Sequence, residues 1–127
     1  MGLLSVIVAA LASYAFGSVW YMTLAKPWME ASGLSEETIN RKDPVPYILA
    51  FVMTLLVAGM MRHVFALSGV DTVSKGFVSG LGLGLFIAAP WIITNCGFAQ
   101  RPKILMLIDG GYAAIGCTII GVVLALF

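Results

Sequence analysis

The chain has 127 residues, of which 61% are hydrophobic and 10% charged, and its formal net charge is +1. Soluble domains carry about 25% charged residues, so this chain has too little charge to cover a water-facing surface of its size. The charges form short clusters without a basic stripe, which excludes nucleic acid as a partner. We therefore expect one integral membrane domain over residues 1–127, surrounded by the lipid bilayer.

Four apolar stretches are each long enough to cross a hydrocarbon core of about 30 Å. They predict helices at about residues 3–24, 44–67, 75–98 and 102–126. Short connections between consecutive helices favour antiparallel neighbours. The predicted fold class is all-α: an integral membrane four-helix bundle of antiparallel up-and-down hairpins.

The first helix combines small residues with aromatic residues near its end. Ser13 and Gly17 are four residues apart and predict close packing against another helix. Trp20, Lys26 and Trp28 suit anchors at the membrane interface. In the following loop, Ser35 precedes two glutamates and predicts the cap of a short interfacial helix.

The third helix carries a doubled G-x-x-x-G pattern and a proline. Gly76, Gly80 and Gly84 predict a face for tight helix contact, either within the monomer, which we favour, or across a subunit boundary. Pro90 lacks an N–H and crowds the carbonyl four residues earlier, so we expect a kink just before it.

Polar residues gather around the third connection, at Thr94, Asn95, Arg101, Asp109 and Tyr112. In the fourth helix, Asp109 and Tyr112 share a face that should point inward. The stripe of Gly80 and Gly84 should continue through Ile87, Trp91, Thr94 and Phe98, with Asn95 beside it. Since the third and fourth helices are antiparallel, Asn95 and Asp109 should lie at comparable depth, within reach of each other.

Asp109 has two interpretations. In the first, which we favour, a structural network holds it through Asn95, Tyr112 or Tyr21, or through Arg101 or Arg41 from the loops. In the second, it binds a proton or cation in a half-membrane cavity. A charge at mid-helix costs about 2.5–3.5 kcal/mol on insertion scales, and a position near the interface lowers that cost.

Basic residues predict the orientation. The first and third loops and their edges hold Lys26, Arg41, Lys42, Arg101 and Lys103, against Arg62 and Lys75 around the second. The positive-inside rule then places loops 25–43 and 99–103 in the cytoplasm and both termini outside.

Two blocks of residues resemble a known family. They comprise Trp20-Tyr21 and Lys26-Pro27-Trp28-Met29, then Thr94-Asn95, Arg101-Pro102 and Leu107-Ile108-Asp109-Gly110-Gly111-Tyr112. Over nearly its whole length the chain resembles the bacterial membrane family "domain of unknown function 1761". The resemblance implies a small four-helix protein of the bacterial cytoplasmic (inner) membrane, with no established activity and no catalytic residues to transfer.

Small multidrug transporters are similar only in size and helix number. Their essential carboxylate lies in the first helix, which has no acidic residue here. The sequence also has no Ser/His/Asp order, no G-x-S-x-G and no metal-ligand cluster, so we expect no enzyme, no cofactor and no metal site. Cys96 and Cys117 should lie roughly 20 Å apart in depth and remain unpaired.

The expected function is that of a non-enzymatic interaction or accessory protein, forming a homo-oligomer or joining a larger membrane complex. The alternative is a small proton- or cation-coupled transporter or channel that uses the polar residues around Asp109.

Overall fold

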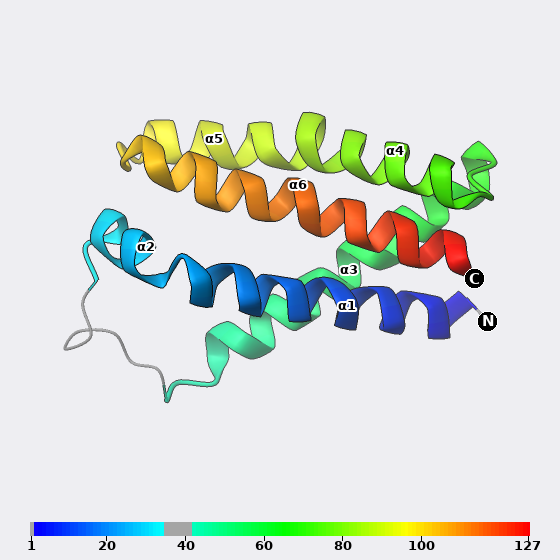
Figure 1. Cartoon of the computed structure of the whole chain (residues 1–127), viewed down its shortest axis with the longest axis horizontal. Helices are drawn as coiled ribbons and strands as arrows, with labels where there is room; N and C mark the ends of the chain where they lie inside the picture. The colour runs from blue at the N-terminus through cyan, green and yellow to red at the C-terminus, as the bar shows by residue number, and fades with distance from the viewer. Residues whose placement is uncertain (1, 35–41) are drawn as a thin grey trace.

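The computed structural model describes residues 2–34 and 42–127, which form helices joined by short connections (Figure 1). The chain runs through α1 (Gly2–Thr23), α2 (Ala25–Ser32), α3 (Val45–Ser68), α4 (Val73–Leu83), the π-helical turn η1 (Gly84–Ala88), α5 (Ala89–Phe98) and α6 (Lys103–Leu126). Because α4, η1 and α5 form one continuous helix, four helices are long and apolar enough to cross a membrane. The all-α class with four spanning helices is confirmed.

Local sequence explains where the helices begin and end. Pro44 immediately precedes α3 and Pro102 precedes α6, positions where a missing N–H is tolerated. The Thr72 side chain accepts a hydrogen bond of 3.2 Å from the Lys75 N–H and so caps α4. Gly33 and Gly69 end α2 and α3 with positive φ angles of 76° and 71°, which glycine adopts without strain.

The first loop contains a short helix, α2, as expected, but it lies earlier than the cap at Ser35 predicts. It follows α1 almost without interruption. The Ser35-capped helix and Arg41 fall outside the described residues. Trp28 on α2 lies edge to face with Tyr21 on α1, with ring centroids 6.1 Å apart, so α2 is held against the end of α1.

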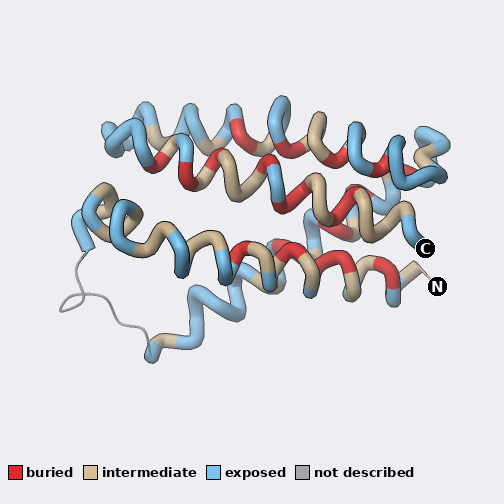
Figure 2. The backbone as a smooth tube through the Cα atoms, in the orientation of Figure 1, coloured by how far each residue is buried: buried red, intermediate tan, exposed pale blue. Residues whose placement is uncertain are grey.

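Helix α6 is the centre of the molecule, because it packs against α4, α1, α5 and η1 (Figure 1). Its buried positions include Leu105, Ile108, Ala114, Cys117 and Ile120, and the buried parts of the other helices turn toward it (Figure 2). Cys117 and Cys96 are both free thiols.

The glycine face of α4 packs on α6 within the monomer. A Cβ atom at Gly80 would lie 2.5 Å from the Cys117 carbonyl oxygen, and one at Gly84 would lie 2.7 Å from the Ala113 carbonyl oxygen. Gly76 lies directly against the backbone of Gly121. No larger side chain fits between these two backbones, so the three glycines are required for the α4–α6 contact.

Small residues of α1 make the second contact with α6. The Ser13 hydroxyl donates a hydrogen bond of 3.2 Å to the Gly116 carbonyl oxygen. Gly17 lies under the ring of Tyr112, since a Cβ atom there would be 2.6 Å from the Tyr112 Cε1 atom. Ser13 and Gly17 therefore pack as their spacing predicts.

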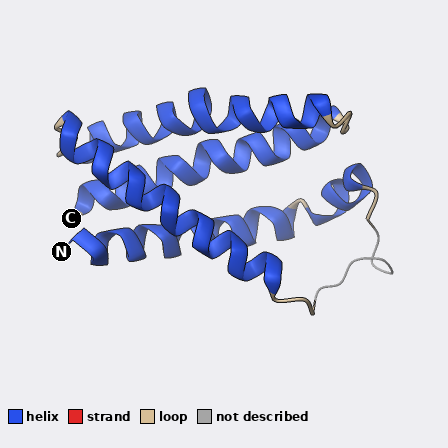
Figure 3. Ribbon diagram, turned by 180° about the vertical axis from the view of Figure 1, so that it is seen from behind, coloured by secondary structure: helices blue, strands red, loops and turns tan. Residues whose placement is uncertain are grey.

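Helix α3 is less buried than α1 and α6, and as little buried as the helix formed by α4, η1 and α5. Thr54, Ala58, Met61 and Phe65 form its buried side, and Phe51 contacts Tyr14 of α1 edge to face at 5.6 Å. Helix α3 packs mainly on α1, touches α6 and makes hardly any contact with α4. Seen from behind, it runs obliquely across the other long helices (Figure 3).

The π-helical turn η1 lies immediately before Pro90. The Ala89 N–H donates to the Gly84 carbonyl oxygen, five residues back instead of four. Because Pro90 has no N–H and crowds the carbonyl of Phe86, a wider turn here relieves the clash. The distortion lies where a kink was expected, and it takes the form of one extra residue in the turn.

This extra residue shifts the face that meets α6. Up to the turn, the contact residues are spaced by four, at Gly76, Gly80 and Gly84. Beyond it they are Ala89 and Ile93, whose side chains lie 3.7 Å and 4.0 Å from a Cβ atom placed at Gly110. The interval across η1 is therefore five, and the expected continuation of the stripe through Ile87, Trp91 and Phe98 is wrong, because these three side chains are exposed.

Candidate functional site

Asp109 lies at the start of α6, opposite the last turn of α1. The Tyr21 hydroxyl donates a hydrogen bond of 2.6 Å to the Asp109 Oδ1 atom, and both side chains are half-buried. A hydrogen bond to a carboxylate at this distance is among the stronger neutral-to-charged contacts. Tyr21 is thus one of the partners that the sequence offered for Asp109.

Aromatic rings surround this hydrogen bond. Tyr112 meets Tyr21 edge to face, with centroids 5.2 Å apart, and Phe16 stacks on Tyr112 at 6.3 Å. Such pairs contribute about 0.5–1.5 kcal/mol beyond the area they bury. We call the group Asp109, Tyr21, Tyr112, Phe16, Trp20 and Trp28 the aromatic–carboxylate cluster.

Trp20 has a role that sequence reasoning missed. Its indole N–H donates a hydrogen bond of 2.9 Å to the Ile108 carbonyl oxygen, and its ring lies 3.0 Å from the position of a Cβ atom at Gly111. The glycine at 111 therefore admits the indole against α6. The adjacent pair Gly110-Gly111 was the available signal, since it marks a stretch of helix that another group can approach closely.

Three predicted site residues lie apart from the cluster. Thr94 is exposed, and its hydroxyl donates to the Pro90 carbonyl oxygen of its own helix at 2.9 Å. Asn95 is exposed. It follows Ile93, which contacts α6, by two residues, so it points about 200° around the helix from the face that meets α6. The π-helical turn is the cause, because a continuous α-helix would have rotated Asn95 about 100° closer.

Arg101 also points elsewhere. Its guanidinium donates a hydrogen bond of 3.4 Å to the Ser32 carbonyl oxygen at the end of α2, and both groups are exposed. The contact ties the third connection to the first. Lys26 is exposed at the start of α2, and its role as an interface anchor stays a prediction.

The cluster is held together by hydrogen bonds and ring contacts. Within residues 2–34 and 42–127, no lysine, arginine or histidine forms an ion pair with Asp109. The same ranges contain no group of three or more His, Cys, Asp or Glu side chains that could hold a metal ion. Tyr21 occupies one carboxylate oxygen, so the other can accept a further donor.

Comparison with known proteins gives one match. A family model described as "Protein of unknown function (DUF1761)" matches residues 4–125. No curated protein and no solved structure matches the chain.

Proposed function

The chain belongs to this family of unknown function, and we propose from its own geometry that it is a non-enzymatic interaction protein that packs against further transmembrane helices. It does so as a homo-oligomer or as an accessory subunit of a larger complex. The proposal includes its location in the bacterial cytoplasmic membrane, with loops 25–43 and 99–103 on the cytoplasmic side and both termini outside.

The observation that carries this proposal is the incomplete packing of α3. Helix α3 packs mainly on α1 and hardly meets α4, and most of its residues are exposed. Val52 and Leu56, which are exposed, share one face with the half-buried Gly59 at i, i+4 and i+7. We call these three residues the open face of α3.

Gly59 supports a protein neighbour on this face. A Cβ atom at Gly59 would meet nothing within 4 Å, and the side chain of Leu56 is 62% exposed. In membranes, helices associate through small residues that let backbones approach, because burial of apolar area alone gives no advantage over lipid. The glycine face of α4 is already used inside the monomer, which leaves the open face of α3 for a partner.

The test is native mass spectrometry of the protein extracted gently from its own membranes. A stoichiometric foreign protein supports the accessory subunit, and a second copy supports the homo-oligomer. Gly59→Leu should reduce the associated fraction, because the leucine keeps two backbones apart. Gly82→Leu is the matched control, since Gly82 also has nothing within 4 Å of its Cβ position but lies on α4.

Cross-linking in the membrane before extraction detects an association that detergent would dissociate. Leu56→Cys in a background of Cys96→Ala and Cys117→Ala should form a disulfide between two copies if the partner is a second copy. A monomer in both the spectrum and the cross-linked membrane contradicts the proposal, as does an associated fraction that Gly59→Leu leaves unchanged.

A proton or cation site at Asp109 is the second candidate. It is favoured by one observation, that the half-buried carboxylate has no cationic partner within the described parts of the chain. Reconstituted vesicles should then show a proton or cation flux that Asp109→Asn abolishes and Asp71→Asn preserves. We rank it second because Tyr112 and Trp28 both pack against Tyr21, which serves helix contact better than an ion path.

A further inference from the structure

A shallow, mainly apolar groove with one charged residue at its end lies between the last turns of α3 and the α4–η1 segment. Two cavities form it, of about 440 Å³ and about 330 Å³. They share Ser68, Val70 and Ser79, so they are continuous. Both are open depressions of the surface and not enclosed cavities.

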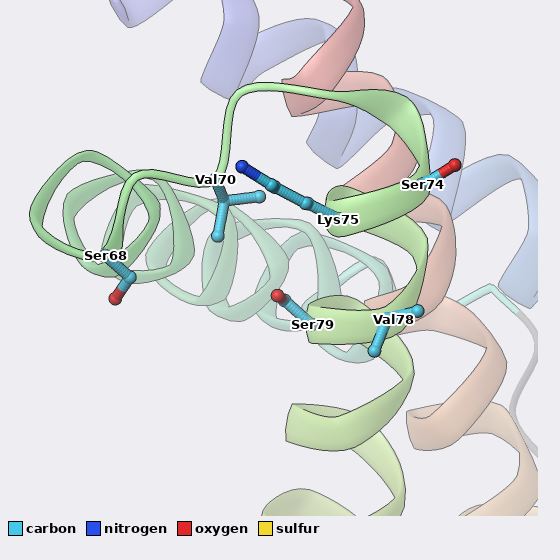
Figure 4. Close-up of a pocket in the computed structure, with 6 residues that line it drawn as sticks. All are labelled: Ser68, Val70, Ser74, Lys75, Val78 and Ser79. Atoms are coloured by element: carbon cyan, nitrogen blue, oxygen red, sulfur yellow. The ribbon is translucent and has the colours of Figure 1, made fainter.

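The end that contains Lys75 is next to the connection between the two helices. Lys75 and Ser79 project from α4 toward Val70 and Ser68 (Figure 4). The Lys75 ammonium lies 3.2 Å from the Asp71 Oδ1 atom; both side chains are mostly exposed, and Asp71 lies beside the groove without lining it. An ammonium group has three donors, so Lys75 has two left beside this ion pair.

The apolar end extends from there toward the middle of the membrane. It is lined by Phe65 of α3 and by Gly82, Leu83 and Phe86 of the α4–η1 segment. Lys75, Ser79 and Gly82 share one face at i, i+4 and i+7, and Phe86 of η1 lines the groove beyond them. Lys75 and Phe86 are separated by 11 residues, or about 16 Å at 1.5 Å per residue. That length is close to half of a hydrocarbon core of about 30 Å, which is one leaflet.

We propose that this groove binds one phospholipid with a zwitterionic, primary-amine headgroup, of the phosphatidylethanolamine type. The phosphate contacts Lys75, the headgroup ammonium contacts Asp71, and one acyl chain lies along Phe65, Gly82 and Phe86. The adjacent opposite charges of Lys75 and Asp71 complement those of the headgroup, and the groove is as long as the leaflet in which such a lipid lies.

The charge pattern selects among possible occupants. An anionic phosphatidylglycerol would also meet Lys75, but it offers Asp71 no cation. A phosphatidylcholine headgroup carries a positive charge without an N–H, so it cannot donate a hydrogen bond to Asp71. An apolar helix from a second copy would leave the charged end unmatched. The groove uses the last turns of α3, beyond the open face, so this proposal does not depend on the proposed function.

The test is native mass spectrometry of the full chain in a mild detergent, titrated separately with phosphatidylethanolamine, phosphatidylglycerol and phosphatidylcholine. We expect a one-to-one complex that retains phosphatidylethanolamine best. Lys75→Gln should lower its retention about fivefold, as expected for one partly exposed charged contact.

The apolar end is tested by a matched pair of variants. Gly82→Leu should fill the groove and lower retention of all three lipids, because its Cβ position has no neighbour and the side chain extends into the cavity. Gly59→Leu, an equal change outside the groove, should retain lipid like the parent protein. Thermal unfolding of each variant shows whether it folds. If Gly82→Leu does not fold, Lys75→Gln still tests the proposal, because it changes an exposed side chain.

Three outcomes overturn the proposal. One is equal retention of the three lipids, and another is retention that neither Lys75→Gln nor a folded Gly82→Leu changes. The third is a second copy or foreign protein whose binding Gly82→Leu abolishes, which would assign the groove to a helix. A failure of lipid binding leaves the effect of Gly59→Leu on association intact, so the two proposals fail separately.

Discussion

The hydrogen bond between Tyr21 and Asp109 joins the end of the first helix to the start of the last. Asp109 is half-buried, and the Tyr21 hydroxyl donates a hydrogen bond of 2.6 Å to its Oδ1 atom. A carboxylate near the membrane interface retains part of its contact with water, which lowers the cost of placing it there. One strong donor and a shell of aromatic rings are therefore enough to hold it.

We predict that Tyr21→Phe lowers the free energy of unfolding by about 1–3 kcal/mol, because it leaves a half-buried acceptor without its donor. Tyr14→Phe is the control: the Tyr14 hydroxyl donates to the Tyr47 carbonyl oxygen at 3.3 Å in an exposed place, so its loss should cost less than about 1 kcal/mol. Reversible unfolding in mixed micelles measures both. Equal losses would show that the Asp109 contact contributes no more than a surface hydrogen bond.

At the scale of a helix, the α4–α6 contact depends on which glycine is changed. Gly80→Ala places a methyl group 2.5 Å from the Cys117 carbonyl oxygen and 3.1 Å from the Thr118 Cα atom. Both are backbone atoms that cannot turn aside, so the two helices must separate, at a cost of about 1–3 kcal/mol or more. The neighbouring glycine contacts, at Gly76 and Gly84, would be weakened too.

Gly82→Ala is the matched comparison, two residues away on the same helix. No atom lies within 4 Å of its Cβ position, so we predict an unchanged stability or a gain of up to about 1 kcal/mol from the better helix propensity of alanine. Thermal unfolding of the two variants side by side makes the measurement. Similar effects at Gly80 and Gly82 would contradict the packing described for α4.

The expected elements and the observed site differ for a physical reason. Apolar length and proline position suffice to predict the four spanning helices, and glycine spacing predicts the face of α4, because both are local properties. The position of Asn95 could not be predicted, because it depends on whether the clash at Pro90 is relieved by a kink or by a π-helical turn. That choice shifts every residue after Pro90 by about 100° around the helix.

The sequence also could not predict which side of α3 packs against α1. Its residues facing α1 and its exposed residues are both apolar, and hydropathy does not separate a lipid-facing side from a helix-facing one. The role of Trp20 illustrates the same difficulty, since an indole at the end of a spanning helix suits an interface anchor as well as a contact with Ile108.

At the scale of the whole molecule, the property to test is the orientation of the chain in the membrane. We predict that Val70→Cys, in a background of Cys96→Ala and Cys117→Ala, reacts with a membrane-impermeant maleimide added outside intact cells, whereas Ala99→Cys in the same background reacts only after lysis. The five-to-two distribution of basic residues between the two sides is the reason. The reverse labelling pattern would place loops 25–43 and 99–103 outside.

The π-helical turn has a consequence for how much the length of this chain can vary. Gly84 and Ala89 both contact α6 across an interval of five, and Phe86 between them is 75% exposed. Removing one outward residue from 84–88 would restore an interval of four and keep both contacts in place, provided that Pro90 is also replaced. Any deletion elsewhere between Gly76 and Phe98 would rotate one half of the helix against the other. Members of this family that are shorter by one residue between Gly76 and Phe98 should therefore have lost it between Gly84 and Ala88, and should lack the proline.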